Sequence, residues 1–319
     1  MVDLHERRRL GRTAVTVTSL GFGAATLGNL YAPVSDAQCQ AAVDAAWDAG
    51  IRYFDTAPHY GLGLSERRLG AALAGRAREE FVVSTKVGRL LVDNPRPTGS
   101  DPDLFDVPDD LTRVRDYSAD GVRRSLEASL DRLGLDRVDV VLVHDAEEYL
   151  DQAVNEAVPA LAALRDQGQI GAVGVGMSDW QGLHRFVVES DVDVVMVAGR
   201  WTLVDRRAEP LMVAAQEHGV SVLAAAAYNS GLLSAPWPPD DATYDYGPAS
   251  AEVLERARAW ARRAEQHGVT LPDLAVQFPL RHPATAAVVL GLRSADEVAA
   301  AVDRLRRPVP EEVWAHPEP

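Results

Sequence analysis

Short apolar segments alternate with segments of helical periodicity along almost the whole chain. The apolar segments have the length of β-strands and are apolar throughout, rather than at every second position. Such strands are buried on both faces, which is typical of a parallel sheet covered by helices. We expect eight of them, over residues 19–23, 51–54, 81–86, 138–143, 170–177, 192–198, 220–226 and 285–290. The helices are expected over residues 36–49, 64–75, 118–133, 151–167, 179–189, 206–218, 250–267 and 294–306.

Eight strand–helix units in succession predict an α/β fold, a closed (β/α)8 TIM barrel that makes one domain of residues 1–319. A short β-hairpin over residues 7–10 and 14–17 is expected before the first barrel strand. A doubly wound sheet is the alternative. It is less favoured because no Gly-x-Gly-x-x-Gly motif follows the first strand, where the sequence has only Gly21-Phe22-Gly23.

Two connections are unusually long, over residues 90–117 and 234–249, and both are rich in Pro, Asp and Gly. Loops of this length in a compact domain are either functional or disordered, and we expect lids at the C-terminal face of the barrel. Three helix starts carry the signature of a capping box, namely Ser35 with Gln38, Ser178 with Gln181, and Ser294 with Glu297.

Composition narrows the class of protein. The chain has 319 residues, 47% of them hydrophobic, and a formal net charge of −15, which disfavours a nucleic acid or an anionic membrane as partner. Cys39 is the one cysteine, so neither a disulfide framework nor a cysteine-rich metal site is expected, and no metal site is predicted. The chain shows no signal peptide or apolar run of membrane-spanning length. We therefore expect a cytoplasmic protein that is a monomer or a small homo-oligomer and acts on a small molecule.

Lys86 is the only lysine among the 32 basic residues other than histidine. It stands at the end of the third expected strand, where a buried cation needs a partner. A compact ammonium and a broad guanidinium are not interchangeable in a tight site. This isolated lysine therefore suggests a specific role, although an accident of composition or a structural ion pair would also explain it.

Three further residues follow strand ends in a way that complements Lys86. Asp55 follows the second strand, Tyr60 lies five residues later, and His144 follows the fourth strand. In a barrel of this kind the chemistry lies at the C-terminal ends of the strands. An ammonium beside a phenol is expected to lower the pKa of the phenol toward neutrality, with Asp55 orienting the ammonium and a neutral His144 binding a substrate oxygen. Singly, each residue also has a plain explanation, such as a turn cap for Asp55.

The segment from Phe54 to Gly61 (FDTAPHYG), the triad Leu64-Ser65-Glu66, the segment from Ser84 to Val87 (STKV) and His144 resemble the aldo-keto reductase superfamily. The resemblance extends from about Arg8 to Arg306. It implies a (β/α)8 barrel, a nicotinamide cofactor bound without a Rossmann fold, and hydride transfer at the barrel mouth. It also implies the catalytic residues, with Tyr60 as general acid/base, Lys86 and Asp55 tuning it, and His144 orienting the substrate.

The same resemblance implies how the cofactor is held. Ser178 would bind the carboxamide and Trp201 would stack on the nicotinamide, whereas Asp179 and Ala198 depart from the family's usual asparagine and glutamine. Arg293 would contact the phosphate on the adenosine side at the start of the last helix, which favours NADP and leaves NAD open. Ala301 replaces an asparagine common in the family. The full set of expected cofactor residues is Gly23, Asp55, Ser178, Trp201, Asn229, Ser230, Gly231, Leu232, Gly291, Arg293, Ser294 and Glu297.

Within the superfamily, three segments are similar to the L-fucose and D-threo-aldose 1-dehydrogenases and to L-galactose dehydrogenase. They are residues 27–31, 175–178 and 198–202. This implies oxidation of an L-fucose, L-galactose or D-arabinose type aldose at C1 to a lactone. The residues expected to contact the substrate are Asn29, Tyr31, Tyr60 and His144.

Three alternatives stay open from the sequence. The enzyme could be an NADPH-dependent reductase of a non-sugar aldehyde or ketone, because the same residues run the reaction both ways. Lys86 could form a Schiff base, as in aldolases. A regulatory subunit that binds the cofactor without turnover is the alternative outside the enzymes.

Overall fold

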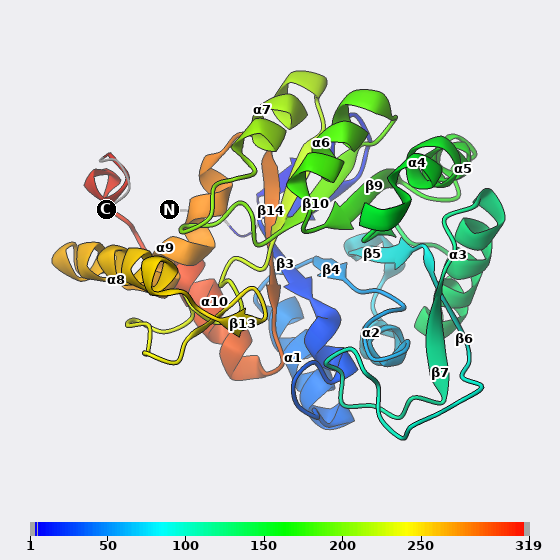
Figure 1. The fold of residues 1–319 in the computed structure, drawn as a ribbon, viewed down its shortest axis with the longest axis horizontal. Coiled ribbons are helices and arrows are strands. Elements are labelled where there is room, and N and C mark those ends of the chain that lie inside the picture. Colours follow the sequence, from blue (N-terminus) through cyan, green and yellow to red (C-terminus); the bar gives the residue numbers. More distant parts are fainter. Residues whose placement is uncertain (1–3, 5, 316–319) are drawn as a thin grey trace.

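The computed structural model describes Leu4 and residues 6–315, and its centre is a closed barrel of parallel strands (Figure 1). Each of the eight expected strands has a counterpart within a few residues, so the predicted (β/α)8 barrel is confirmed. Around the barrel the strands follow in chain order, and the last closes onto the first with Val288 opposite Leu20. They are β3 (Leu20–Gly23), β4 (Tyr53–Asp55), β5 (Val82–Val87), β8 (Val140–His144), β9 (Ala172–Met177), β10 (Val194–Ala198), β11 (Ser221–Ala225) and β14 (Thr285–Gly291).

Helices surround the barrel, as Figure 1 shows. They are α1 (Asp36–Asp48), α2 (Leu64–Leu73), α3 (Ala119–Leu133), α5 (Val158–Asp166), α6 (Trp180–Glu189), α7 (Glu209–His218), α8 (Ala251–Gln266) and α10 (Ala295–Arg306). The expected helix over residues 151–167 is α4 (Leu150–Gln152), a π-helical segment (Ala153–Ala157) and α5 in continuity. One helix was not predicted, α9 (Leu271–Gln277), because seven residues are too few for a periodicity to show. Among the described helices, none is both long enough and apolar enough to span a membrane.

A β-hairpin closes the N-terminal end of the barrel. Its strands β1 (Arg7–Arg9) and β2 (Thr16–Thr18) pair in antiparallel fashion. Leu10 and Val17 lie in the apolar cluster that also holds side chains of β4, β8, β10 and β11, and the Gly11 amide donates to Ser221 Oγ (2.8 Å). This end is therefore filled, and the C-terminal ends of the strands are left to form a site.

The first long connection forms a structured wall and is not disordered. It contains the antiparallel strands β6 (Arg89–Asp93) and β7 (Leu111–Arg115), with β6 against α3 (Figure 1). A buried pair, Asp101 with Arg113, ties its tip to β7 at 2.6 and 2.7 Å. Backbone hydrogen bonds from Tyr31 to Leu104 and from Asp106 to Asn29, both 3.0 Å, fasten it to the loop after β3. The second connection contains the short strands β12 (Thr243–Tyr244) and β13 (Gly247–Pro248).

The predicted capping boxes have three different outcomes. The box of Ser35 and Gln38 is confirmed at α1. At α10 the Ser294 hydroxyl accepts the Glu297 amide as predicted, but the Glu297 carboxylate accepts from Arg293 instead of Ser294. The box of Ser178 and Gln181 is wrong, because Asp179 is the N-cap of α6 and accepts the amides of Gln181 and Gly182. A carboxylate one residue closer to the helix meets both amides directly.

We predict that Gly70→Ala lowers the free energy of unfolding by about 2 kcal/mol. A methyl group at Gly70 in α2 would stand 2.1 Å from the Leu133 carbonyl oxygen at the end of α3, and backbone cannot move aside as a side chain can. This overlap outweighs the roughly 1 kcal/mol that alanine gains over glycine in a helix. Urea unfolding measures the difference. The control Ala71→Ser, on the exposed face of the same helix, should cost less than about 1 kcal/mol. A Gly70→Ala variant as stable as the wild type would contradict the close α2–α3 contact.

Candidate active site

The Lys86 ammonium is the centre of the site. It is buried at the end of β5 and donates to Asp55 Oδ2 (2.7 Å), to the Thr56 carbonyl oxygen (2.9 Å) and to the Tyr60 hydroxyl oxygen (3.0 Å). These three acceptors use the three N–H groups of an ammonium. Asp55 is fixed in turn, since Ser84 donates to its Oδ1 (2.7 Å) from the neighbouring strand. The strand pairing, with Asp55 opposite Ser84, therefore brings the ion pair together.

Two glycines bring Tyr60 to this point. The turn after β4 crosses the loop after β3 so closely that a methyl group on Gly61 would lie 2.3 Å from the Gly28 carbonyl oxygen. A methyl group on Gly28 would lie 2.7 Å from the Tyr60 carbonyl carbon. Gly61 also has a positive φ of 60°. The crossing requires residues without a Cβ, and it sets the Tyr60 ring beside the Lys86 ammonium, 4.6 Å from the ring centre.

The pKa of Tyr60 differs from our expectation. Burial raises the pKa of Tyr60 to about 12, and the opposing effect of Lys86 is too small to bring it toward neutrality. The expected lowering of this pKa is therefore wrong for the structure described. Burial alone would lower the pKa of Lys86, but Asp55 and Tyr60 together raise it above its usual range. Lys86 is thus held as an ammonium with every N–H in use, which argues against a Schiff-base role.

The hydrogen of the Tyr60 hydroxyl is free. Its oxygen accepts from Lys86, and the hydroxyl has no acceptor within the described part of the chain. His144, at the end of β8, stands at right angles to the Tyr60 ring with 5.8 Å between ring centres. Burial, with Arg89 and Lys86 nearby, holds the pKa of His144 well below its usual range, so the imidazole is neutral. The structure thus brings together the four side chains that the sequence singled out.

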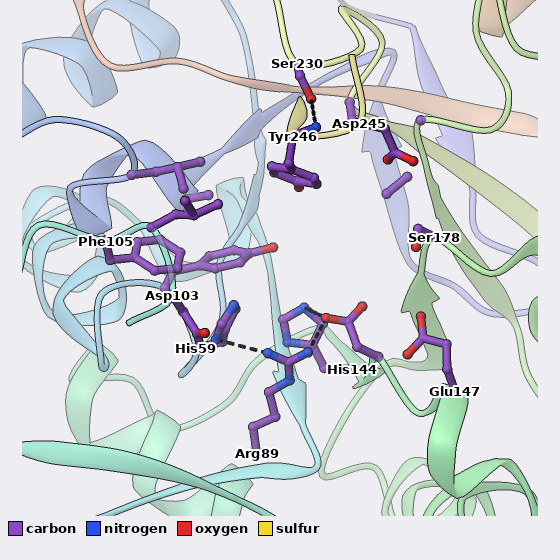
Figure 2. Close-up of a pocket in the computed structure, with 18 of the residues that line it drawn as sticks. His59, Arg89, Asp103, Phe105, His144, Glu147, Ser178, Ser230, Asp245 and Tyr246 are labelled. Carbon is purple, nitrogen blue, oxygen red and sulfur yellow. Dashed lines mark hydrogen bonds and ion pairs between the residues drawn. The ribbon is translucent and has the colours of Figure 1, made fainter. Parts of the chain in front are cut away.

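Of these four side chains, Tyr60 and His144 line a cavity of about 630 Å³ at the C-terminal end of the barrel. Figure 2 shows His59, Arg89 and His144 on one side of it and Ser230, Asp245 and Tyr246 across from them. Most of the side chains that line the cavity can form hydrogen bonds. The polar or aromatic side chains that line it include His59, Tyr60, Arg89, Asp103, Phe105, Arg115, His144, Asp145, Glu147, Ser178, Arg200, Asn229, Ser230, Asp245 and Tyr246.

Several of these residues were missed by the sequence analysis as site residues. His59 precedes Tyr60, Arg89 lies three residues beyond Lys86, and Asp145 follows His144. Their positions directly after barrel strands were the available signal. Arg200 carried the same signal, since it lies two residues after β10, whereas Tyr246 lies in the second long connection and carried none. Arg200 Nη2 donates to both carboxylate oxygens of Asp245 (2.8 and 2.9 Å), 45 positions along the chain.

Some of the expected cofactor residues line the cavity, and others do not. Ser178, Asn229 and Ser230 line the cavity, whereas Leu232 is buried in the core. Trp201 is not among the lining residues, since its ring packs on Phe278 (5.3 Å) and His282 (5.6 Å) between barrel and helices. Stacking of Trp201 on a nicotinamide stays a prediction, since in this structure the indole faces Phe278 and His282.

Most of the remaining expected cofactor residues lie in β3, in β14 or at the start of α10. Gly291 pairs with Gly23, and Gly231 takes a positive φ of 97° after β11. At the start of α10, the Arg293 guanidinium stands 3.4 Å from the Glu297 carboxylate, and Ser294 caps the helix.

Asn29 and Tyr31, which we expected to contact the substrate, are not among the residues that line the cavity. The Asn29 side chain is committed to structure, since it donates to the Asp106 carbonyl (2.9 Å) and accepts from Val34 (3.0 Å) and Arg68 (2.7 Å). The substrate contact of Asn29 therefore stays a prediction, and in this structure the side chain ties loops together. Tyr31 is 54% exposed and does not line the cavity, but partial burial raises its pKa, and so does Tyr246 of the cavity wall, which lies close to it. Its contact with a substrate stays a prediction.

Two unpartnered polar groups test whether a nicotinamide cofactor fits. Asn229 Oδ1 is buried without a hydrogen-bond partner, and the Ser178 hydroxyl has none among the described residues. Both belong to side chains that line the cavity at the ends of β9 and β11. A nicotinamide carboxamide both donates and accepts hydrogen bonds, so these groups fit it.

Comparison with known proteins agrees with this geometry. The model of the Aldo/keto reductase family matches residues 19–318. The chain is 44% identical to the D-threo-aldose 1-dehydrogenase of a Pseudomonas species over 94% of this chain and 93% of the relative. It is 38% identical to the pyridoxal 4-dehydrogenase of Microbacterium luteolum, over 97% and 95%. Its structure resembles the holo form of an aldo-keto reductase from Bacillus halodurans, with a TM-score of 0.77, 26% identity and coverage of 97% and 94%.

We predict that the buried neutral state of His59 makes the protein less stable in acid. Burial, with Arg89 and Arg113 nearby, lowers the pKa of His59 to about 2, whereas an unfolded histidine titrates near 6.5. Below about pH 6.5 the unfolded chain binds more protons at this site than the native chain, so stability falls as the pH falls. Between about pH 7.5 and pH 5 this one site removes about 2 kcal/mol.

Urea unfolding of the wild type and of His59→Gln at the two pH values measures this contribution. The stability difference between the two proteins should shift by about 2 kcal/mol in favour of the variant at the lower pH. His267→Gln, which replaces an exposed histidine at the end of α8, is the control and should not change the pH dependence. Parallel pH curves for wild type and His59→Gln would contradict the neutral state of His59.

Proposed function

The chain belongs to the aldo/keto reductase family, and from that premise we propose that it oxidises an aldose at C1 to the lactone with NAD or NADP. Family membership makes the chain an NAD(P)-dependent oxidoreductase. The observation that carries the proposal is the Tyr60 hydroxyl. It is held by the Lys86 ammonium at 3.0 Å and keeps its own hydrogen for a group in the cavity.

Each residue has a defined part in this reaction. A bound nicotinamide cofactor supplies the hydride acceptor. Tyr60 takes the proton of the C1 hydroxyl as C1 gives up its hydrogen with two electrons, which leaves a carbonyl group at C1. Lys86 stabilises the tyrosinate form, and Asp55 keeps Lys86 in place. His144 orients the reacting oxygen of the substrate.

The protonation of Tyr60 bears on the direction of the reaction. With a pKa of about 12 the phenol is protonated at neutral pH and ready to donate, which suits carbonyl reduction. Oxidation requires the tyrosinate, and its population rises with pH. Alkaline conditions therefore favour oxidation, and reduction is accessible near neutrality.

The assignment to a sugar rests on two supports. One is the 44% identity to a D-threo-aldose 1-dehydrogenase, with the L-fucose, L-galactose and D-arabinose types as candidate substrates. The other is the polar wall of the cavity, since many hydroxyl groups need many donors and acceptors. The runner-up is NADPH-dependent reduction of a non-sugar aldehyde or ketone. The relative named pyridoxal 4-dehydrogenase supports it, because that name denotes a substrate that is not a sugar.

For the cofactor, Arg293 and the start of α10 are proposed to bind the adenosine side, with Ser294 and Gly291 beside them. Arg293 would favour a phosphate there, as in NADP. The Glu297 carboxylate beside it opposes further negative charge, as NADP would bring. NAD and NADP therefore both stay candidates.

We predict that Tyr60→Phe lowers kcat by about 10²–10⁴-fold, because the proton donor and acceptor is removed. The affinity for the cofactor, measured by quenching of protein fluorescence, should stay near that of the wild type. Tyr149→Phe removes a hydroxyl outside the cavity and is the matched control, with no expected loss of kcat. A large loss of cofactor binding with turnover retained would rule out the role of Tyr60.

The substrate class is tested with a panel of aldoses, simple aldehydes, ketones and pyridoxal, each with NAD and with NADP. The reaction is followed by the absorbance of the reduced nicotinamide. We expect the highest kcat/KM for an aldose of the L-fucose, L-galactose or D-arabinose type. A higher value for a non-sugar carbonyl compound would favour the runner-up. Cofactor binding without turnover of any member would contradict the enzyme proposal.

A further inference from the structure

His59 lies in the cavity wall with one ring nitrogen occupied and the other free. Its Nδ1 is 3.1 Å from Nη1 of Arg89, the first residue of β6. Its Nε2 has no partner among the described residues. Phe105 stands edge-on to the ring at 5.3 Å, and the His144 ring is 5.6 Å away. Figure 2 shows the contact to Arg89 as a dashed line, on the same side of the cavity as His144.

The contact to Arg89 decides which tautomer His59 adopts. A guanidinium has five N–H donors and no acceptor, so Nδ1 of His59 must carry the lone pair. In a neutral imidazole the proton is then on Nε2. The wall therefore offers an N–H donor at His59 Nε2, in a fixed direction.

Arg89 is itself fixed on its other side by Asp145. The second guanidinium nitrogen contacts Asp145 Oδ2 at 2.5 Å, and His144 Nε2 stands 3.5 Å from the same oxygen. Asp145 has a positive φ of 43°, a conformation that aspartate adopts more readily than most other residues. Hydrogen bonds hold it there, from its amide to the Gly176 carbonyl (3.0 Å) and from the Tyr117 hydroxyl to its own carbonyl (2.8 Å).

This wall thus offers both donor and acceptor groups. His59 Nε2–H donates, the free N–H groups of Arg89 donate, and Asp145 Oδ1, which has no partner among the described residues, accepts. Neighbouring hydroxyl groups of a sugar need this combination, because each hydroxyl both donates and accepts. A simple aldehyde has a single oxygen, which Tyr60 and His144 already serve.

We propose that His59 binds a substrate hydroxyl next to the reacting carbon through Nε2–H, and that Arg89 is the positioning residue that holds His59 in this tautomer. The tautomer follows from the geometry of His59 and Arg89 alone. The identity of the ligand as a polyhydroxylated substrate rests on the function proposed above.

The tautomer is tested by nitrogen NMR of protein labelled at histidine. The His59 signals are assigned by their loss in His59→Gln. We expect the wild type to show a protonated Nε2 and an unprotonated Nδ1 near neutral pH. Arg89→Met removes the donor to Nδ1 and should produce a mixture of tautomers. Arg115→Met is the matched control, because Arg115 pairs with Arg89 across β6 and β7 and lines the same cavity but bonds to Glu148. It should leave the His59 tautomer unchanged.

A proton on Nδ1 in the wild type would overturn the proposal. So would an unchanged tautomer in a folded Arg89→Met protein. Circular dichroism in the near ultraviolet verifies that each variant retains its native packing.

The contact to substrate is tested by kinetics of His59→Leu and His59→Gln. Leucine removes the donor, whereas the glutamine amide can place an N–H near the position of Nε2. For an aldose we expect kcat/KM to fall about tenfold in His59→Leu, mainly through KM, and to recover most of this loss in His59→Gln. For reduction of propanal, which has no hydroxyl group to accept from Nε2–H, the loss in His59→Leu should be smaller than for the aldose, and His59→Gln should not differ from His59→Leu.

Equal losses for the aldose and for propanal would overturn the substrate contact, and so would equal losses in the two variants. A wild-type protein that oxidises no aldose would instead refute the proposed function. The NMR measurement would still decide the tautomer in that case, so the two failures are distinguishable.

Discussion

The buried ammonium of Lys86 is the constraint on which the rest of the site depends. A charge removed from water is costly unless it is paired and fully hydrogen-bonded, and here a carboxylate, a carbonyl and a phenol oxygen meet the three N–H groups. Such a pair is not in itself a strong source of stability, because desolvation offsets most of the attraction. Its main effect is geometric: Asp55, Thr56 and Tyr60 cannot move without leaving a buried charge unpaired.

The same rigidity extends outward through contacts between backbone segments. The crossing of Gly28 and Gly61 fixes the turn that carries His59 and Tyr60. Arg113, anchored by Asp101, donates to the carbonyl of His59 (2.8 Å) and so joins this turn to the wall formed by β6 and β7. The cavity is thus bordered by elements that hold each other, and its polar groups keep fixed directions. Preorganisation of this kind reduces the cost of ordering a substrate with many hydroxyl groups.

Burial also keeps His59, His144 and Tyr60 uncharged near neutral pH. His59 and His144 stay neutral because protonating them would add charge to a buried cluster that already contains Arg89 and Lys86. Tyr60 stays protonated near neutral pH for the corresponding reason, since a buried phenolate is costly even beside Lys86. Near neutral pH the polar wall therefore presents a constant pattern of donors and acceptors. The phenol is the group that we propose to exchange a proton with the substrate.

The sequence by itself determined the barrel and the identity of the four central side chains. Apolar strands in a regular alternation with helices leave few other ways to bury both faces of each strand, and residues directly after such strands must gather at one end of the barrel. Asp55, Tyr60, Lys86 and His144 could be selected on that ground. The sequence also contained His59, Arg89 and Asp145 at equivalent positions, but it offered no means of judging which of them face the cavity.

Only the tertiary structure decided how deeply these groups are buried and what each one contacts. The pKa of Tyr60 depends on the balance of desolvation against one nearby ammonium, and neither distance nor burial can be derived from spacing along the chain. Trp201 turns into the core and Asn29 ties two loops together, because packing between segments far apart in sequence determines where a loop side chain points. Local patterns determine elements and their order, whereas long-range packing determines the direction and the protonation of a side chain.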